Sequence, residues 1–383
     1  MRVSILILSL LIFYGIITGW GSDLVSASPG SDPVVKHAKG FSITYESGCT
    51  ILRTNASRKD GSLSFSATQT IILVPEGVAA VEIPGAKTIR VPVERVGINF
   101  PTEMGMLRAI GELDHVVATC FPYGYPEIEQ GIKTGKVNVT GTPGRYNLEL
   151  LVQSRPDVVF AFCQSGVQKK YYDQAAKYGL PVVMVHPFME LSPLAKAEWM
   201  KFLACFFQQE EKAGLLFNKI ESDYYELKRL VKNQINGMPT AFWATGSPKS
   251  WTANRNGFFS ILMTDAGALN VLYQPDAPSQ SKIADELLVA LAAESDFWIT
   301  DHPDQRQLAG NSAARFKASR ANRLYDSQRQ LPEMGFSEFF GMGDVHPEWV
   351  LADLISIFHP RLLPGHQLRF FKRQSPELKK KKR

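Results

Sequence analysis

The sequence predicts an α/β protein in which two doubly wound α/β lobes are joined by a single long rigid helix. In residues 209–234, apolar side chains recur every three or four positions, which is typical of one face of a helix. At 1.5 Å per residue this helix would measure ~37 Å, longer than a crossover helix needs to return over a strand of roughly 17–20 Å. Strands and helices alternate on both sides of it, which favours parallel sheets. The alternative is an ordinary surface helix of a single domain.

Composition sets the size of the cores and excludes one class of partner. The chain has 383 residues, of which 45% are hydrophobic, which is enough for two medium cores. The net charge is +5, but residues 379–383 alone supply five positive charges. The body of the chain is therefore near neutral, and its charge gives no reason to expect nucleic-acid binding. We expect residues 372–383 to form a basic disordered tail.

The N-terminus has the pattern of a secretory signal. A positively charged start is followed by an apolar run over residues 3–20, and Val25, Ser26 and Ala27 form a small-x-small site. We expect residues 1–27 to be a signal peptide that is cut after Ala27, with an uncleaved N-terminal anchor as the alternative. The four cysteines show no CxxC spacing, so a disulfide is permitted but not indicated; they are Cys49, Cys120, Cys163 and Cys205.

The elements follow in chain order. Residues 40–46 and 50–54 alternate like a hairpin, and 69–74 and 88–93 add short strands, so we expect residues 28–93 to be a small antiparallel extension of the first lobe. The first α/β lobe, residues 94–208, is predicted to contain about four parallel strands. The second lobe, residues 235–371, restarts the same plan. In the first lobe the strands are 95–100, 115–120, 157–162 and 181–186, and the helices 102–110, 147–153, 168–178 and one opened by Ser192 and Pro193. In the second lobe the strands are 240–245 and 296–300, and the helices 258–266, 285–293 and 347–357.

Polar and aromatic residues directly follow the predicted strands, and this is where open α/β sheets bind ligands. Aromatic rings offer flat apolar walls, while arginine and amide groups hold an anionic edge. For any one of these residues, capping of a core or a solvated loop position is an equal alternative. The first-lobe candidates are Asn99, Phe100, Thr102, Phe121, Tyr123, Tyr125, Cys163, Gln164, Ser165 and His186. The second-lobe candidates are Ser250, Trp251, Thr252, Asn254, Arg255, Asn256, Asp301 and His302.

Catalytic and metal motifs are weak in this sequence. It contains no glycine-rich phosphate loop, nucleophile elbow or zinc-protease helix, which argues against the commoner exported hydrolases. Cys120, Cys163, His186 and His302 would together suit a transition metal or a haem iron. In the usual strand order the second and third strands are not neighbours, so we expect buried free thiols and no metal site. His346 and His359 are expected to cap or pack.

Several segments resemble the periplasmic substrate-binding proteins of ABC importers for iron complexes and cobalamin. The likeness spans roughly residues 39–371 and rests on five segments: 94–118, NLELLVQSRPDVVFA at 147–161, 178–217 with its EEKA helix start, ADELLVALAAESDFWI at 284–299, and 347–364. The resemblance implies a ligand cleft between the lobes and delivery of the ligand to a membrane permease that is coupled to a cytoplasmic ATPase. It also implies that Glu149 and Glu286 dock onto the permease, whereas helix N-terminus contacts are their alternative role.

The resemblance leaves the ligand open, because no arrangement of arginines or tyrosines matches a particular haem or siderophore binder. We expect a monomer without catalytic residues or resident cofactor that captures a metal chelate of the ferric siderophore, cobalamin or haem type. An oxyanion such as molybdate or tungstate is the alternative ligand, and an exported hydrolase or chelatase using His186 with Ser165, or a sensor, is the alternative function. Since no lipid-accepting cysteine follows the apolar run, the Gram-negative periplasm is the expected location.

Overall fold

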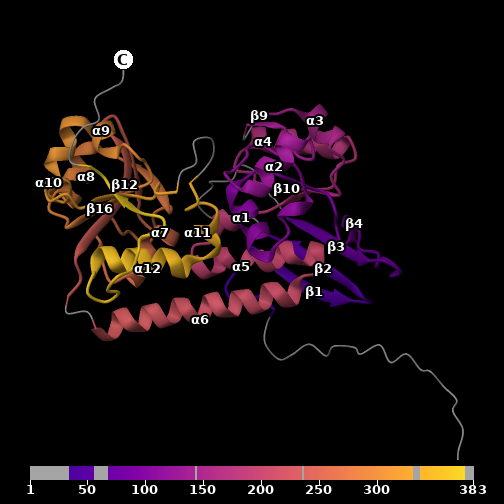
Figure 1. Ribbon diagram of the computed structural model, residues 1–383, viewed down its shortest axis with the longest axis horizontal. Coiled ribbons are helices and arrows are strands. Elements are labelled where there is room, and N and C mark those ends of the chain that lie inside the picture. Colours follow the sequence, from indigo (N-terminus) through magenta and orange to yellow (C-terminus); the bar gives the residue numbers. More distant parts are fainter. Residues whose placement is uncertain (1–33, 56–67, 143–144, 235–236, 331–336, 376–383) are drawn as a thin grey trace, which may run out of the picture. The chain divides into compact units, whose positions relative to one another are not determined.

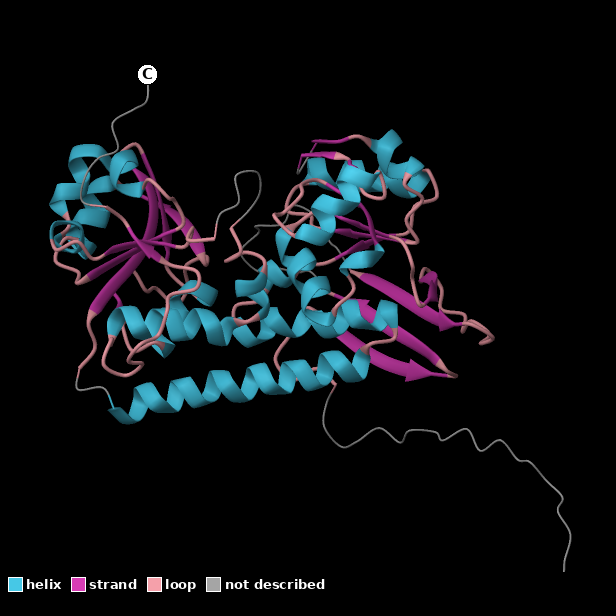
Figure 2. Ribbon diagram, in the orientation of Figure 1, coloured by secondary structure: helices cyan, strands magenta, loops and turns pink. Residues whose placement is uncertain are grey.

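The computed structural model describes residues 34–55, 68–142, 145–234, 237–330 and 337–375. The expected signal peptide and the residues 379–383 lie outside these ranges. The described chain is an α/β structure in which each of the two larger sheets has helices packed against it (Figure 2). The predicted fold class is confirmed.

The first lobe is built on a five-stranded, fully parallel sheet of the order β11-β10-β5-β6-β7. Its three central strands are buried along their whole length, which explains why they read as continuous apolar runs. The strands are β5 (Val96–Ile98), β6 (Val116–Thr119), β7 (Asn138–Val139), β10 (Val158–Ala161) and β11 (Val182–Met184). The helices are α1 (Pro101–Ile110), α2 (Pro126–Thr134), α3 (Leu148–Gln153) and α4 (Gly166–Lys177), with 3-10 turns at Leu113–His115 and Pro187–Met189. A small ribbon pairs β8 (Gly141–Thr142) with β9 (Arg145–Tyr146).

The N-terminal segment forms a separate four-stranded sheet, β1 (Phe41–Glu46), β2 (Cys49–Thr54), β3 (Gln69–Pro75) and β4 (Lys87–Val91). The hairpin β1–β2 is confirmed, but the prediction of a wholly antiparallel sheet is wrong, because β4 runs parallel to β3. Residues 76–86 connect these two strands, which is long enough to carry the chain back before it pairs.

Two buried carboxylates of the first lobe hold the chain just before β1. Glu198 accepts hydrogen bonds from the backbone N–H groups of Lys36, His37 and Ala38 at 2.7–2.8 Å. Glu190 accepts from the N–H groups of residues 39 and 40 at 3.0 and 2.8 Å. These bonds satisfy the backbone N–H groups of residues 36–40, which precede β1 and are not part of its pairing with β2.

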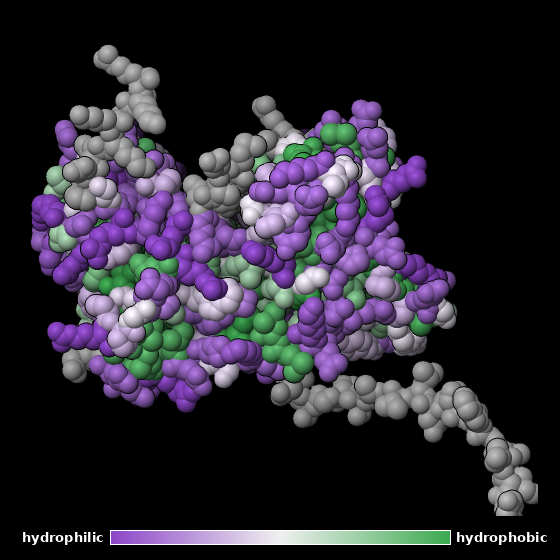
Figure 3. All heavy atoms as spheres, in the orientation of Figure 1, coloured by the Kyte–Doolittle hydropathy of each residue, from purple (hydrophilic) through white to green (hydrophobic). Residues whose placement is uncertain are grey.

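Helix α6 (Glu210–Gln234) is the predicted long helix, with bounds within one residue of the prediction. It follows α5 (Pro193–Ala204) and the 3-10 turn Cys205–Phe207. Gln208 lies between this turn and α6 and interrupts the helix, because its backbone is left-handed, with φ of 55°. Helix α5 is buried at every position, so it is a core helix. Helix α6 packs on α5 and on α12 (Pro347–Phe358) and so contacts a helix from each half of the chain (Figure 1). Hydrophobic residues reach the viewed surface in places among hydrophilic ones (Figure 3), and on α6 Leu215 is 65% exposed.

The second lobe contains a seven-stranded mixed sheet, so the prediction that it repeats the plan of the first lobe is wrong. Its path is β15-β13-β12-β16-β17-β18, with β14 also paired to β12; β13, β15 and β18 pair antiparallel. The strands are β12 (Thr240–Ser247), β13 (Ser250–Asn254), β14 (Leu269–Asn270), β15 (Gln280–Ile283), β16 (Phe297–Thr300), β17 (Leu324–Asp326) and β18 (Lys372–Arg373). The helices are α7 (Gly257–Asp265), α8 (Asp285–Ala292), α9 (Gln305–Ala309), α10 (Lys317–Arg320), α11 (Met342–Val345) and α12, with a 3-10 turn at Gly310–Arg315.

Helix α1 of the first lobe lies against α11, and one glycine allows the close approach. A Cβ atom on Gly105 would lie 2.6 Å from the backbone carbonyl carbon of Gly341. Since backbone cannot move aside as a flexible side chain can, we expect Gly105→Ala to lower the free energy of unfolding by about 2 kcal/mol. Urea unfolding followed by circular dichroism measures this. Gly214→Ala on α6, where nothing lies within 4 Å of the added methyl group, is the control and should be neutral or stabilising. A Gly105→Ala protein as stable as wild type would contradict this close packing.

Candidate ligand-binding site

Four ring side chains gather at the carboxyl edge of the parallel sheet in the first lobe. Phe100 follows β5, Phe162 follows β10, and His186 and Phe188 follow β11. The Phe100 and Phe162 rings are stacked, with centroids 3.7 Å apart and planes within 6°. Phe188 lies 4.7 Å from Phe162 and 5.8 Å from His186, measured between centroids. We call these four residues the aromatic edge.

His186 is the polar member of the aromatic edge. Its side chain is buried, and neither ring nitrogen has a hydrogen-bond partner among the described residues. Burial lowers the pKa of this imidazole to about 4, so the ring is neutral at pH 7. A neutral imidazole keeps one nitrogen lone pair, which can accept a hydrogen bond or coordinate a metal ion.

A hydrogen-bonded group of side chains supports this edge from behind. The Asn99 amide donates to the Tyr172 hydroxyl at 3.2 Å, and that hydroxyl donates to the carbonyl of Phe162 at 3.2 Å. The Cys120 thiol donates to the Asn99 side-chain oxygen at 3.3 Å. Asn99 is thus held inside the protein, where it positions the strand ends. Next to β6, the Phe121 and Tyr123 rings meet edge to face at 5.9 Å.

Ser165 and Gln164 belong to the start of α4. The Ser165 hydroxyl caps this helix by accepting from the N–H of Gln168, and the Gln168 side chain in turn accepts from the N–H of Gln164. In the described chain no hydrogen bond joins Ser165 to His186. The serine–histidine pair that a hydrolase of this type needs is not formed in this arrangement.

Thr102 and Tyr125 join the first lobe to the chain that precedes α12. The Thr102 hydroxyl donates to Asp344 at 2.7 Å and lies 3.0 Å from the carbonyl of Phe340. The Tyr125 hydroxyl donates to Glu338 at 3.3 Å, and burial next to this carboxylate raises the pKa of the tyrosine. Both hydroxyls are therefore already hydrogen-bonded within the protein.

The same junction holds a cluster of buried ionisable groups. Lys196 of α5 forms an ion pair with Asp344 at 2.6 Å. Glu103 of α1 is 1% exposed, and neither of its carboxylate oxygens accepts a hydrogen bond from another described residue. Burial, with a contribution from Asp344, raises the pKa of Glu103 to about 8. We call Glu103, Lys196 and Asp344 the charged junction.

Four of the predicted second-lobe contacts lie in a strand and not in a loop; they are Ser250, Trp251, Thr252 and Asn254. Trp251 and Thr252 are part of β13, which the sequence reasoning treated as a loop after β12. The Trp251 ring is buried among core residues and its N–H donates to Asp285 at 2.8 Å. Thr252 accepts from Lys282 across the strand pair at 3.0 Å. Trp251 therefore packs in a core, which the sequence analysis gave as the alternative to ligand contact.

The remaining second-lobe candidates follow strand ends. Asn256 caps α7, and its amide donates to the carbonyl of Pro275 at 2.7 Å. Arg255 keeps a buried Nε without a hydrogen-bond partner among the described residues. Asp301 accepts from Trp243 at 3.0 Å, and burial raises its pKa to about 6. His302 accepts from the N–H of residue 304 through its Nδ1 at 3.1 Å.

A metal cluster made of protein side chains is not found in the described part of the chain, where no three His, Cys, Asp or Glu side chains converge. Cys120 and Cys163 follow β6 and β10, which β5 separates, as the sequence predicts. All four cysteines are free and buried, which confirms the prediction of buried thiols. His346 pairs with Glu348 at 2.8 Å, and His359 bonds the carbonyl of Gly267 at 3.0 Å, so both have structural contacts.

Glu149 and Glu286 lie one in each lobe. Each lies in the first turn of a helix, α3 or α8, and each is exposed. Asn147 already caps α3 with its side chain, and Asp285 next to Glu286 is paired with Arg315. Both glutamates are accessible to a partner.

The fold is that of a periplasmic binding protein with two α/β lobes. Residues 100–331 match the family model described as periplasmic binding protein, and the chain belongs to this family. It is similar to an uncharacterized lipoprotein of Methanocaldococcus jannaschii, 21% identical over 372 residues, covering 88% of this chain and 84% of that protein.

Solved structures share the fold. A periplasmic heme-binding protein from Pseudomonas aeruginosa matches with a TM-score of 0.55 and 16% identity over 74% of this chain and 98% of that chain. A periplasmic binding protein from Veillonella parvula matches with a TM-score of 0.57 and 12% identity over 80% and 98%. At these identities the likeness concerns the fold alone. No helix within the described residues combines the length and the apolar character needed to cross a membrane.

Sequence reasoning missed several residues of this region. Phe162 and Phe188 adjoin residues that were named, and the rule of inspecting strand ends would have found them. Helix α2 was missed although Pro126 at its start and Gly135 at its end are ordinary helix signals. Glu103, Lys196 and Asp344 gave no signal, because their contact joins positions far apart in the chain.

Proposed function

We propose that this protein captures a metal chelate of the ferric siderophore, cobalamin or haem type between its lobes and delivers it to an ABC permease with a cytoplasmic ATPase. The aromatic edge is the observation that carries the proposal. Flat rings suit the planar or aryl parts of such ligands, and the buried His186 has ring nitrogens without a partner among the described residues, one of which we propose contacts a metal centre or a polar edge of the ligand. Arg255 and His302 are the proposed polar contacts from the second lobe.

The site chemistry favours a chelate over an oxyanion. A molybdate or tungstate site needs several free N–H and hydroxyl donors. The hydroxyls of Ser165 and Thr102 and the amide of Asn256 are already bonded within the protein. The same bonds argue against the hydrolase alternative, since Ser165 and His186 do not form a nucleophile and base pair.

A thermal-shift titration with ferric siderophores, cobalamin, haemin and molybdate tests the proposal. We expect one chelate to raise the melting temperature in a saturable way, because a ligand that binds only the folded state stabilises it. Stabilisation by molybdate alone would transfer the proposal to oxyanions. No binding together with turnover of an ester or phosphate would overturn it.

His186 gives a sharper test within this proposal. We expect His186→Leu to weaken chelate binding at least tenfold and to raise the unfolding free energy by about 1 kcal/mol, because a buried polar group without a partner is removed. Isothermal titration and urea unfolding measure the two effects. His115→Gln is the matched control for binding, because His115 precedes β6 at the opposite edge of the sheet and contacts Phe207 in a tilted arrangement. Unchanged chelate affinity in His186→Leu would remove the residue from the site.

The two exposed glutamates are proposed to dock onto the permease. We expect Glu149→Arg and Glu286→Arg together to abolish uptake while the chelate affinity stays within twofold, because charge reversal opposes a cationic partner surface. An uptake assay in cells that carry the cognate permease and ATPase measures the loss of transport. Titration of the purified double variant measures its chelate affinity. Glu127→Arg, at an exposed first-turn position of α2, is the control. Wild-type uptake by the double variant would contradict the docking role.

The location follows from the same proposal. We propose an exported protein, in the Gram-negative periplasm as the sequence pattern indicates. The family description and the lipoprotein relative support export. Monomeric action, without a resident cofactor, fits capture and release of a small ligand.

A further inference from the structure

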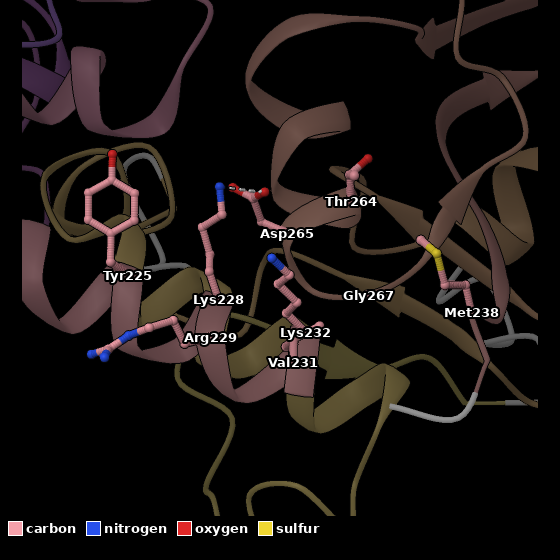
Figure 4. A pocket seen from close by; sticks show the side chains of 9 residues that line it. All are labelled: Tyr225, Lys228, Arg229, Val231, Lys232, Met238, Thr264, Asp265 and Gly267. Carbon is pink, nitrogen blue, oxygen red and sulfur yellow. Dashed lines mark ion pairs between the residues drawn. The ribbon is translucent and has the colours of Figure 1, made fainter. Parts of the chain in front are cut away.

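A cavity lies away from the aromatic edge, between the last turns of α6 and the end of α7. Its volume is about 550 Å³, within the range of small-molecule sites. Figure 4 shows the side chains that line it. They are Tyr225, Lys228, Arg229, Val231, Lys232, Met238, Thr264, Asp265 and Gly267. We call this cavity the α6–α7 pocket.

The walls of the α6–α7 pocket are mainly apolar. Val231 is a buried residue of the core, whereas Met238 is 48% and Tyr225 43% exposed. The methylene stems of the lysines add further apolar surface. Large apolar side chains that remain exposed around one cavity indicate a binding site for an apolar molecule, because binding removes their surface from water.

The rim of the pocket is cationic. Three cations line the rim; Figure 4 shows Lys228 and Lys232 extending toward one carboxylate, Asp265, whereas Arg229 extends away from it. Asp265 is already shared, because Lys228 pairs with it at 2.9 Å and the Tyr224 hydroxyl donates to it at 2.7 Å. Arg229 has only a loose, exposed pair with Glu226 at 3.7 Å. Within the described chain, the Lys232 ammonium has no hydrogen bond or ion pair, and Figure 4 shows it extending toward Asp265.

The ends of α6 and α7 reduce this positive charge but do not cancel it. Each helix C-terminus carries about half a negative charge, and the effect falls off within one turn. Three full cations against one carboxylate and two such ends leave the rim positive. The pocket therefore combines apolar walls with a positively charged rim.

We propose that the α6–α7 pocket binds a small amphiphile that carries one carboxylate on an apolar chain. The chain covers Val231 and Met238, and the carboxylate lies at the Lys232 ammonium. This site is separate from the proposed chelate site and does not depend on it, since none of its lining residues belongs to the strand ends.

Isothermal titration at low ionic strength with octanoate, octanol, octyltrimethylammonium and acetate tests the proposal. We expect octanoate to bind at least fivefold more tightly than octanol or octyltrimethylammonium, and acetate not to bind, because both the chain and the carboxylate contribute. Raising the salt concentration should weaken octanoate binding but not octanol binding. Equal binding of octanol and octanoate, or no saturable binding, would overturn the proposal. Attachment to phosphatidylglycerol vesicles without octanoate binding would assign the rim to a lipid surface and also overturn it.

Variants place the binding in this pocket. Lys232→Gln should remove the preference for octanoate over octanol, and Met238→Asp should weaken both at least tenfold. Met238 is half-exposed, so its replacement leaves the fold intact, which far-ultraviolet circular dichroism checks. Lys219→Gln, on the same helix but outside the pocket, is the control and should bind as wild type. Unchanged octanoate binding in the Met238→Asp protein would place the ligand elsewhere and overturn the proposal.

Discussion

Replacing Lys196 by methionine is expected to lower the free energy of unfolding by about 3 kcal/mol. The ammonium of Lys196 lies 2.6 Å from Asp344, whose side chain is 1% exposed. Removing one partner of a buried ion pair leaves the other charge without compensation in a medium of low polarity, which costs far more than an exposed pair is worth. The same ammonium lies 4.5 Å from the centroid of the Phe258 ring, so a contact with α7 is lost as well.

Urea unfolding of Lys196→Met measures this effect. Lys219→Met, whose side chain is 73% exposed, removes a surface pair with Asp223 and should cost less than about 1 kcal/mol. Adding Asp344→Asn to Lys196→Met should recover part of the loss, because the uncompensated charge is then absent. A Lys196→Met protein within about 0.5 kcal/mol of wild type would contradict the charged junction.

Replacing Glu103 by glutamine is expected to stabilise the protein increasingly as the pH rises. The folded-state pKa of Glu103 is about 8 against an ordinary value of 4.5. A carboxyl group with a raised folded-state pKa contributes stability that is fully present below pH 4.5 and is lost as the pH rises through about 8. Lys196 and Asp344 face this group, and they act on its pKa in opposite directions.

The size of the effect follows from the difference between the two pKa values. Wild type should lose about 4 kcal/mol relative to Glu103→Gln between pH 4.5 and pH 8. Urea unfolding of both proteins at several pH values in this window measures it, with the exposed Glu127→Gln as the control that should follow wild type. Parallel stability curves for wild type and Glu103→Gln would show that Glu103 ionises normally in the folded protein.

The sequence predicts the local elements of this fold better than their pairing. Helix α6 was found within one residue because its apolar period, acidic first turn and basic last turn all agree. Strand β13 was not found, because β12 runs on to Ser247 and turns directly into a hairpin where the sequence suggested a loop. The parallel pairing of β4 with β3 was also missed, because the residues of a short strand do not indicate whether it pairs parallel or antiparallel.

The candidate site was predicted in part for the same reason. Inspecting strand ends located Phe100 and His186, and parallel order then brings them to one edge. The rule cannot tell a side chain that faces a ligand from one bonded inside the protein. Thr102 is bonded to Asp344, Asn99 to Tyr172 and Trp251 to Asp285, and each partner is distant in the sequence. Such contacts depend on the tertiary structure.

Native mass spectrometry of the protein isolated from the envelope of its own cells tests the transport proposal most directly. We expect one bound metal chelate per chain, which is released on denaturation and is absent from a His186→Leu protein prepared in the same way. A protein that carries no chelate, binds none on addition and turns over an ester or phosphate would contradict the proposal.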